Sequence, residues 1–217
     1  NPVLVGTPTI LTATVTGYTP TGNVAFKNGT ATLGTVALSG TGNTRTATYS
    51  ATITTAGDKS LTAVYAGNTN NLTATSTART QSVSKSTTTA SVSSSLPSAT
   101  QGQSVTFTAS VTGYNPSGNV VFKDGATTLA TKALGGTGNT RTATYANTTL
   151  GVGEHSITVD YVGNASNNTS SSTAIAQTIV GKAPTSTTLA SSTNPSIAGQ
   201  SISLTATVTP TTGPLPT

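Results

Sequence analysis

One stretch that occurs twice constrains this chain more than any other feature. The segment from Gly17 to Gly29 (GYTPTGNVAFKNG) returns from Gly113 to Gly125 (GYNPSGNVVFKDG), an offset of 96 residues. In each copy Pro and Gly mark a turn, Val and Phe alternate with other residues as in a strand, and Asn-Gly or Asp-Gly marks a second turn. A period of this length predicts two equivalent structural units followed by a remainder.

Alternating apolar residues continue through each repeat. One strand pattern appears three times, with its apolar positions at Leu11, Ala13 and Val15, at Phe107, Ala109 and Val111, and at Leu204, Ala206 and Val208. About seven short strands fit into each period, separated by turn signals, and helical periodicity is absent from the sequence. The pattern predicts an all-β chain of tandem β-sandwiches.

The repeats divide the chain into three parts. We place repeat one at residues 1–83, repeat two at 84–180, and the first two strands of a third repeat at 181–217. Repeat one lacks the first strand that residues 88–95 supply to repeat two. The joint between the repeats has no long spacer, so we expect the sandwiches to stack end to end.

The incomplete ends have two explanations. The chain is a window cut from a longer tandem array, or its unpaired terminal strands add to the open sheet edge of a neighbouring molecule. The chain begins at Asn1 and contains no Met, and we therefore expect a mature or excised piece of something longer.

The composition excludes several classes of partner. Charged residues make up 6% of the chain, against about 25% in an average soluble protein. A surface of Thr, Ser, Asn and Gly is typical of secreted and cell-surface proteins. The formal charge is +5, but the Lys and Arg residues are scattered singly, so we expect no nucleic-acid partner. No stretch approaches about 18 apolar residues, and we expect no membrane insertion in this segment.

The sequence offers little for catalysis or metal binding. Without Cys there are no disulfides, thiol nucleophiles or thiolate ligands. His155 is the single imidazole, and Lys59 takes its position in repeat one. The acidic residues of repeat two, Asp124, Glu154 and Asp160, lie on separate predicted elements, whereas a calcium site needs convergent oxygens. We therefore expect no enzyme, no cofactor and no metal site.

Two tyrosines are the candidate contact residues. Tyr18 and Tyr114 each lie beside the turn Pro of the doubled segment, where an exposed ring could contact a glycan. The alternative is that each ring caps the end of a sandwich, because Tyr combines an apolar body with a polar tip. Whether the ring would cap its own domain or touch the next one stays open at this level.

Asn-X-Ser/Thr sequons are the other candidate sites. They are candidates for glycosylation in a host with the machinery, although several arise by chance in a chain so rich in Asn and Thr. The sequons begin at Asn28, Asn71, Asn147, Asn164, Asn167 and Asn168.

Several motifs together carry a family resemblance. They are Gly102–Thr112 (GQSVTFTASVT), Gly118–Gly125 (GNVVFKDG), Gly153–Asn164 (GEHSITVDYVGN) and the closing Gln177–Val180 (QTIV). In this order and spacing the sequence resembles the bacterial immunoglobulin-like repeats found in tandem in large surface and adhesin-like proteins. The resemblance implies Ig-like sandwiches used as a stalk or spacer, without catalytic residues.

Composition, repeats and resemblance together predict a function. We expect a non-enzymatic structural module on the surface of, or outside, a prokaryotic cell, serving as a stalk, a spacer or a component of an extracellular filament. The expected partners are neighbouring repeats of the same or an identical chain. Two alternatives stay open: a homopolymeric fibre built by strand exchange between subunits, and a glycan-binding adhesion module.

Overall fold

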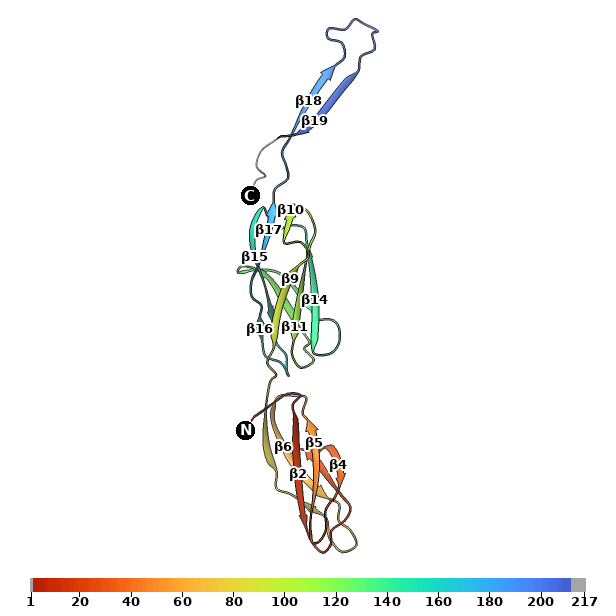
Figure 1. The fold of residues 1–217 in the computed structure, drawn as a ribbon, viewed down its shortest axis with the longest axis vertical. Coiled ribbons are helices and arrows are strands. Elements are labelled where there is room, and N and C mark those ends of the chain that lie inside the picture. Colours follow the sequence, from red (N-terminus) through yellow and green to blue (C-terminus); the bar gives the residue numbers. More distant parts are fainter. Residues whose placement is uncertain (1, 212–217) are drawn as a thin grey trace.

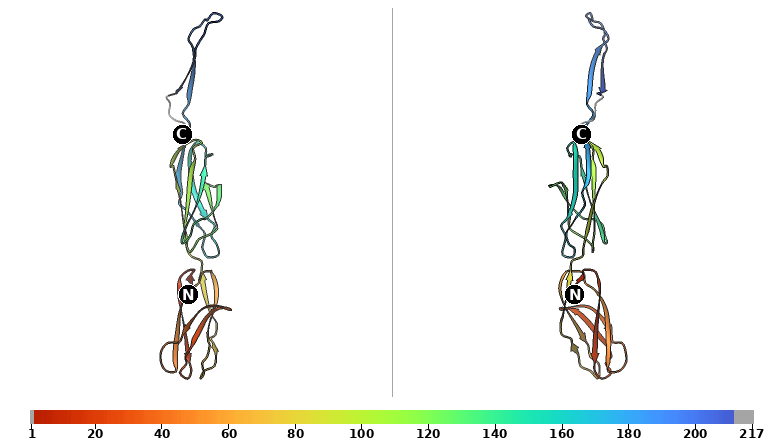
Figure 2. Two further views of the ribbon diagram at one scale, coloured as in Figure 1. Left: turned by 90° about the vertical axis from the view of Figure 1, so that its right-hand side faces the viewer. Right: turned by 60° about the vertical axis from the view of Figure 1, so that its left-hand side comes forward.

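The computed structural model describes residues 2–211, which form two β-sandwiches and a separate hairpin in a row. Figure 1 shows the three parts end to end, and the views in Figure 2 show the same elongated arrangement from two other sides. Among the described residues, no helix is long and apolar enough to cross a membrane. The predicted fold class, tandem all-β sandwiches, is confirmed.

Module one consists of strands β1 to β8. Its larger sheet has the order β1-β8-β6-β3-β4, with β7 paired to β6, and its smaller sheet contains β2 and β5. The strands are β1 (Val3–Leu4), β2 (Pro8–Thr16), β3 (Asn23–Asn28), β4 (Ala31–Ala37), β5 (Thr44–Thr52), β6 (Gly57–Tyr65), β7 (Ala74–Thr75) and β8 (Arg79–Ser84).

Module two consists of strands β9 to β17. Its larger sheet has the order β10-β17-β15-β12-β13, with β16 paired to β15, and its smaller sheet has the order β14-β11-β9. The strands are β9 (Thr89–Ser94), β10 (Ser98–Thr100), β11 (Val105–Thr112), β12 (Asn119–Asp124), β13 (Thr127–Ala133), β14 (Thr140–Asn147), β15 (Gly153–Tyr161), β16 (Ser170–Ser171) and β17 (Ile175–Val180). The added strand β9 is the main difference in topology between the modules.

The doubled segment forms a turn and then a core strand in both modules. Its Val and Phe alternate inward along β3 and β12, so that Val24, Phe26, Val120 and Phe122 are all buried. A core tyrosine at the end of the adjacent strand holds the turn. The Tyr161 hydroxyl, for example, donates to the Ser117 carbonyl at 2.9 Å. The prediction that this segment is a turn followed by a core strand is confirmed.

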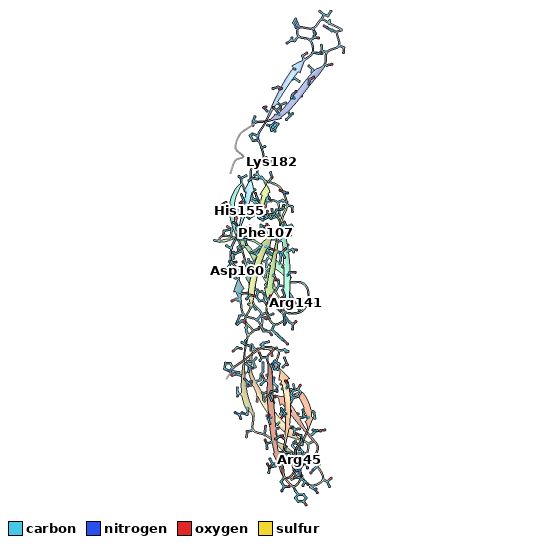
Figure 3. The ribbon with its side chains drawn as sticks, viewed as in Figure 1. Arg45, Phe107, Arg141, His155, Asp160 and Lys182 are labelled. Atoms are coloured by element: carbon cyan, nitrogen blue, oxygen red, sulfur yellow. The ribbon has the colours of Figure 1, made fainter. Side chains whose placement is uncertain are left out.

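The core of module two is more completely enclosed than that of module one. Phe107, Ala109 and Val111 on β11 are fully buried between the two sheets, and Figure 3 labels Phe107 in the middle of the module. On β2 the equivalent residues Leu11 and Val15 are only half-buried. The same strand pattern therefore gives different burial in the two modules.

The C-terminal part is a two-stranded hairpin. Its strands are β18 (Thr185–Ser191) and β19 (Leu204–Pro210), which pair only with each other among the described residues. Both strands lie within residues 181–217, where the sequence predicts the first two strands of a third repeat, and residues 212–217 of that range lie outside the described residues. Every residue of both strands is exposed, so the hairpin has no core of its own.

Candidate inter-module joint and strand groove

A buried asparagine positions the Tyr114 loop. The Tyr114 backbone N–H donates to Asn167 Oδ1 at 2.8 Å, and Asn167 Nδ2 donates to the Tyr114 carbonyl at 2.9 Å. The Asn167 amide thus pairs with both the N–H and the carbonyl of Tyr114, as the backbone of a neighbouring strand would. Its side chain is fully buried. Residue 113 must be Gly, because a Cβ there would lie 2.6 Å from Asn167 Oδ1.

Module one repeats this arrangement at its far end. Asn71 accepts from the Tyr18 N–H and donates to the Tyr18 carbonyl, both at 2.9 Å. In both modules the asparagine follows the tyrosine by 53 residues. Sequence reasoning noted Asn71 and Asn167 only as sequons, although this shared spacing was a signal that they belong to the tyrosine loop.

The Tyr114 side chain packs on the end of module one. It contacts an apolar cluster built from the buried residues Val5, Ile53 and Val83. A Cβ on Gly6 would collide with the Tyr114 ring, and Gly6 also has a φ of 82°, so both space and backbone require Gly there. Tyr114 therefore contacts the preceding module rather than capping the core of its own.

Polar contacts reinforce this joint. Ser166 Oγ, in module two, donates to the Thr54 carbonyl of module one at 2.8 Å. The linker is held as well, because the Ser86 N–H donates to the Ser166 carbonyl at 2.8 Å and the Asn168 N–H donates to the Ser86 carbonyl at 3.0 Å. A linker whose backbone is bonded into the loop of module two has little freedom to swivel.

Tyr18 lies at the opposite end of module one and is 70% exposed. Its backbone is held by Asn71 as Tyr114 is held by Asn167, but no other module covers its ring among the described residues. The two candidate tyrosines therefore share one local structure and differ in what surrounds the side chain.

A groove of about 750 Å³ opens along the side of module one. It runs between β2 on one side and β6 to β8 on the other, and the core residues Val24, Phe26 and Tyr65 line it. In module two the corresponding position is taken by β9, whose Ala90 and Val92 pack against the core. The groove therefore corresponds to the place of one strand.

The side chain of Gln177 is enclosed by the segment that contains β9 in module two. Its side chain is 0% exposed, and Ser94 Oγ on β9 donates to its Oε1 at 2.6 Å. Its amide nitrogen donates to the Pro97 carbonyl at 3.3 Å. The equivalent Gln81 of module one is half-buried and lines the groove.

The sequon asparagines lie in different environments. Besides Asn167, Asn147 is buried and its amide nitrogen donates to the Tyr145 hydroxyl at 2.8 Å. Asn71 and Asn164 are half-buried and hydrogen-bonded within their loops. Asn28 is half-buried at the end of β3, and Asn168 is exposed. The amides of Asn147 and Asn167 are covered in the folded module, so a glycosyltransferase would reach them only before folding.

His155 has two partners that the sequence did not suggest. Its Nδ1 lies 2.6 Å from Asp124 Oδ2 and its Nε2 lies 2.9 Å from the Gly151 carbonyl. Burial lowers the pKa of His155, but the Gly151 carbonyl, the Asp124 hydrogen bond and the Asp124 charge together outweigh it and raise the pKa above its usual value. Two acceptors around one ring favour the protonated imidazole.

In module one a lysine takes the place of this histidine. Lys59 Nζ donates to the Ala56 carbonyl at 3.0 Å and to Thr55 Oγ1 at 3.1 Å. Both modules therefore place a basic side chain against the loop that precedes β6 or β15. The role of Lys59 and His155 is to hold that loop. Figure 3 shows His155 and Asp160 apart on module two, and the described residues contain no group of three or more potential metal ligands.

No curated protein sequence matches the chain. Among solved structures, the fibronectin(III)-like modules of Clostridium thermocellum CbhA are 18% identical, with 82% of this chain and 87% of that chain covered and a TM-score of 0.35. An I-band fragment of titin is 14% identical, with 95% and 72% covered and a TM-score of 0.33.

The match to a family is more direct. The model of the bacterial Ig-like domain (group 3) matches residues 1–84 and matches again over residues 88–180. The two matches fall on modules one and two, and together they span most of the chain. The chain therefore belongs to the bacterial Ig-like domain (group 3) family.

Proposed function

We propose that this chain is a non-enzymatic extracellular spacer, part of the stalk of a prokaryotic cell-surface or adhesin-like protein. The observation that carries the proposal is the joint, in which Tyr114 of module two packs on Val5, Ile53 and Val83 of module one. A joint of this kind gives a tandem array a defined direction and a fixed length per module. Such geometry suits a protein that holds another domain away from a cell surface.

The joint resists bending by a simple mechanism. Tilting module two away from module one would expose the Tyr114 ring and the apolar residues beneath it. Complete burial of a large apolar side chain is worth about 1.5–3 kcal/mol, and the half-buried Tyr114 ring gains part of that. Tilting would also break the hydrogen bond from Ser166 to Thr54, which contributes about 1 kcal/mol. These contacts oppose bending at the joint.

Small-angle X-ray scattering of the dilute monomer tests this role. Replacing Tyr114 by Ala should broaden the distribution of end-to-end distances and shorten its mean, because the apolar contact is lost while both modules stay folded. Tyr18→Ala is the matched control, since it removes the equivalent ring where no module covers it. We expect this control to scatter like the unmodified chain. An unmodified chain already as bent as the Tyr114→Ala variant would contradict the spacer role.

The glycan-binding alternative has less support. Module one covers the Tyr114 ring, which leaves Tyr18 as the only one of the two candidate rings that is open to a ligand. A single tyrosine on a convex loop provides little surface for a sugar. The spacer is therefore the function that we propose.

A further inference from the structure

The groove of module one has the form of a strand site. In module two β9 pairs antiparallel with β11, with Val92 opposite Ala109 and Ser94 opposite Phe107. The equivalent strand β2 pairs with β5, and within residues 2–211 its other edge has no partner strand. An open strand edge presents unpaired N–H and C=O groups and is a template for an added strand, and the inward-facing Leu11 and Val15 on β2 are only half-buried.

Strand β18 is the counterpart, in the third repeat, of the strand β9 that fills this site in module two. It pairs with β19 in the register that β9 uses with β11, so that Leu189 lies opposite Ala206 as Val92 lies opposite Ala109. Leu189 nevertheless remains 69% exposed, because no second sheet covers the hairpin. A lone two-stranded hairpin is marginally stable in water.

We propose that β18 of one chain enters the groove of module one in a second copy, where it takes the place that β9 has in module two. The register of module two then puts Leu189 opposite Ala13 on β2. It also puts Ser191 opposite Leu11 and beside Gln81, as Ser94 lies beside Gln177. The inserted strand matches the site in length, alternation and polarity.

The exchange gains burial at little cost in hydrogen bonds. β18 would bond to β2 through the edge that it now uses for β19, so backbone hydrogen bonds lost in the hairpin are remade in the groove. Leu189 then becomes buried, and the strand covers Leu11 and Val15, which line the groove and are now half-buried. The net driving force is the apolar surface removed from water.

The geometry favours exchange between copies rather than within one chain. Figure 1 places the hairpin and module one at opposite ends of the molecule, with module two between them. A tail that fills the first module of the next copy makes a head-to-tail contact, which propagates as an open fibre unless the rotation closes a ring. The partner of the groove is therefore a second copy of this chain.

Engineered disulfides test the register, because the chain has no Cys of its own. Thr14 and Thr188 are exposed and would lie opposite each other, as Ser110 and Ser91 do in module two. Under mild oxidation the double variant Thr14→Cys/Thr188→Cys should form a ladder at multiples of the 21.3 kDa chain. The control, Thr14→Cys/Thr207→Cys, carries its second Cys on β19 and should form no ladder at the same dilution. Equal ladders from both variants would overturn the register.

Light scattering of the disulfide-free chain tests the association itself. We expect a mass that rises with concentration above 21.3 kDa, and Leu189→Asp should return it to the monomer. Ile197→Asp is the matched control, because Ile197 is 79% exposed in the hairpin loop, outside β18, and should leave association unchanged. A chain that stays monomeric at every concentration would overturn strand exchange between copies and leave the groove to a strand from elsewhere. That outcome would not affect the Tyr114 joint, which the scattering of the monomer tests separately.

Discussion

Modules one and two carry nearly the same strand pattern, yet their cores are closed to different degrees. Val111 on β11 is fully buried, whereas its equivalent Val15 on β2 is half-buried. Gln177 is buried against β9, whereas Gln81 lines an open groove. The difference is one short strand, β9, which module one lacks among its described residues.

The effect of one strand is large because the chain has few large apolar side chains with which to close a core. Only 33% of the chain is hydrophobic, and it contains no Trp or Met. Ala90 and Val92 are among the residues that close the core of module two. Module one has no such strand among its described residues, and Leu11 and Val15 on the facing strand β2 stay half-buried.

Hydrogen exchange should show the largest contrast between the modules. Amides of β11 that face β9 are bonded and buried, whereas the corresponding amides of β2 face the groove. We expect those of β2 to exchange about a hundredfold faster or more, because they open without unfolding of the module. The measurement is best made on Leu189→Asp, in which the groove stays empty whether or not strand exchange occurs. Equal protection of β2 and β11 would mean that the groove closes without a strand.

Truncating the equivalent phenylalanines should give a smaller contrast. Phe122→Ala should lower the unfolding free energy of module two by about 3–5 kcal/mol, as expected for a fully packed core position. Phe26→Ala should cost module one at least about 1 kcal/mol less, because Phe26 already borders an open groove whose walls can relax. Denaturant unfolding with separate transitions for the two modules measures both changes. Equal losses would show that the groove does not loosen the core around Phe26.

The smallest contrast concerns pH. Because the pKa of His155 is raised in the folded module, its stabilising effect is fully present below the unfolded value of about 6.5 and is lost as pH rises through the folded pKa. The melting temperature of module two should therefore fall by a few degrees above about pH 6.5. Module one should not change there, since the single histidine of the chain lies in module two. His155→Lys is the matched variant and should remove the pH dependence, and an unmodified module two that melts independently of pH would contradict this role.

Much of the fold was predictable because equivalent core positions occur in more than one copy of the repeat. The inward faces of β2, β11 and β19 share one apolar alternation, and the doubled segment identified the turn before β3 and β12. Aligning the copies also predicts that repeat one lacks the first strand of repeat two. Periodicity records which residues face inward, and this is the information that places strands in a sandwich.

The joint was not predictable in the same way. Tyr18 and Tyr114 stand in matching sequence contexts, so no local pattern distinguishes the exposed ring of Tyr18 from the half-buried ring of Tyr114. The joint depends on contacts between residues far apart in the chain, such as Ser166 with Thr54, and on the space that Gly6 leaves for the Tyr114 ring. The bonding of Asn71 and Asn167 to the tyrosine backbone likewise appears only when the loops are folded together.

The sequence by itself determined the module length, the strand pattern and the absence of disulfides, because a repeated alternation and a composition are properties of the chain alone. Tertiary structure decided what each copy of a residue does. It placed Tyr114 on module one and left Tyr18 in solvent, and it buried Gln177 under a strand that Gln81 lacks among the described residues. Identical local sequences acquire different roles because burial depends on which neighbouring element covers them.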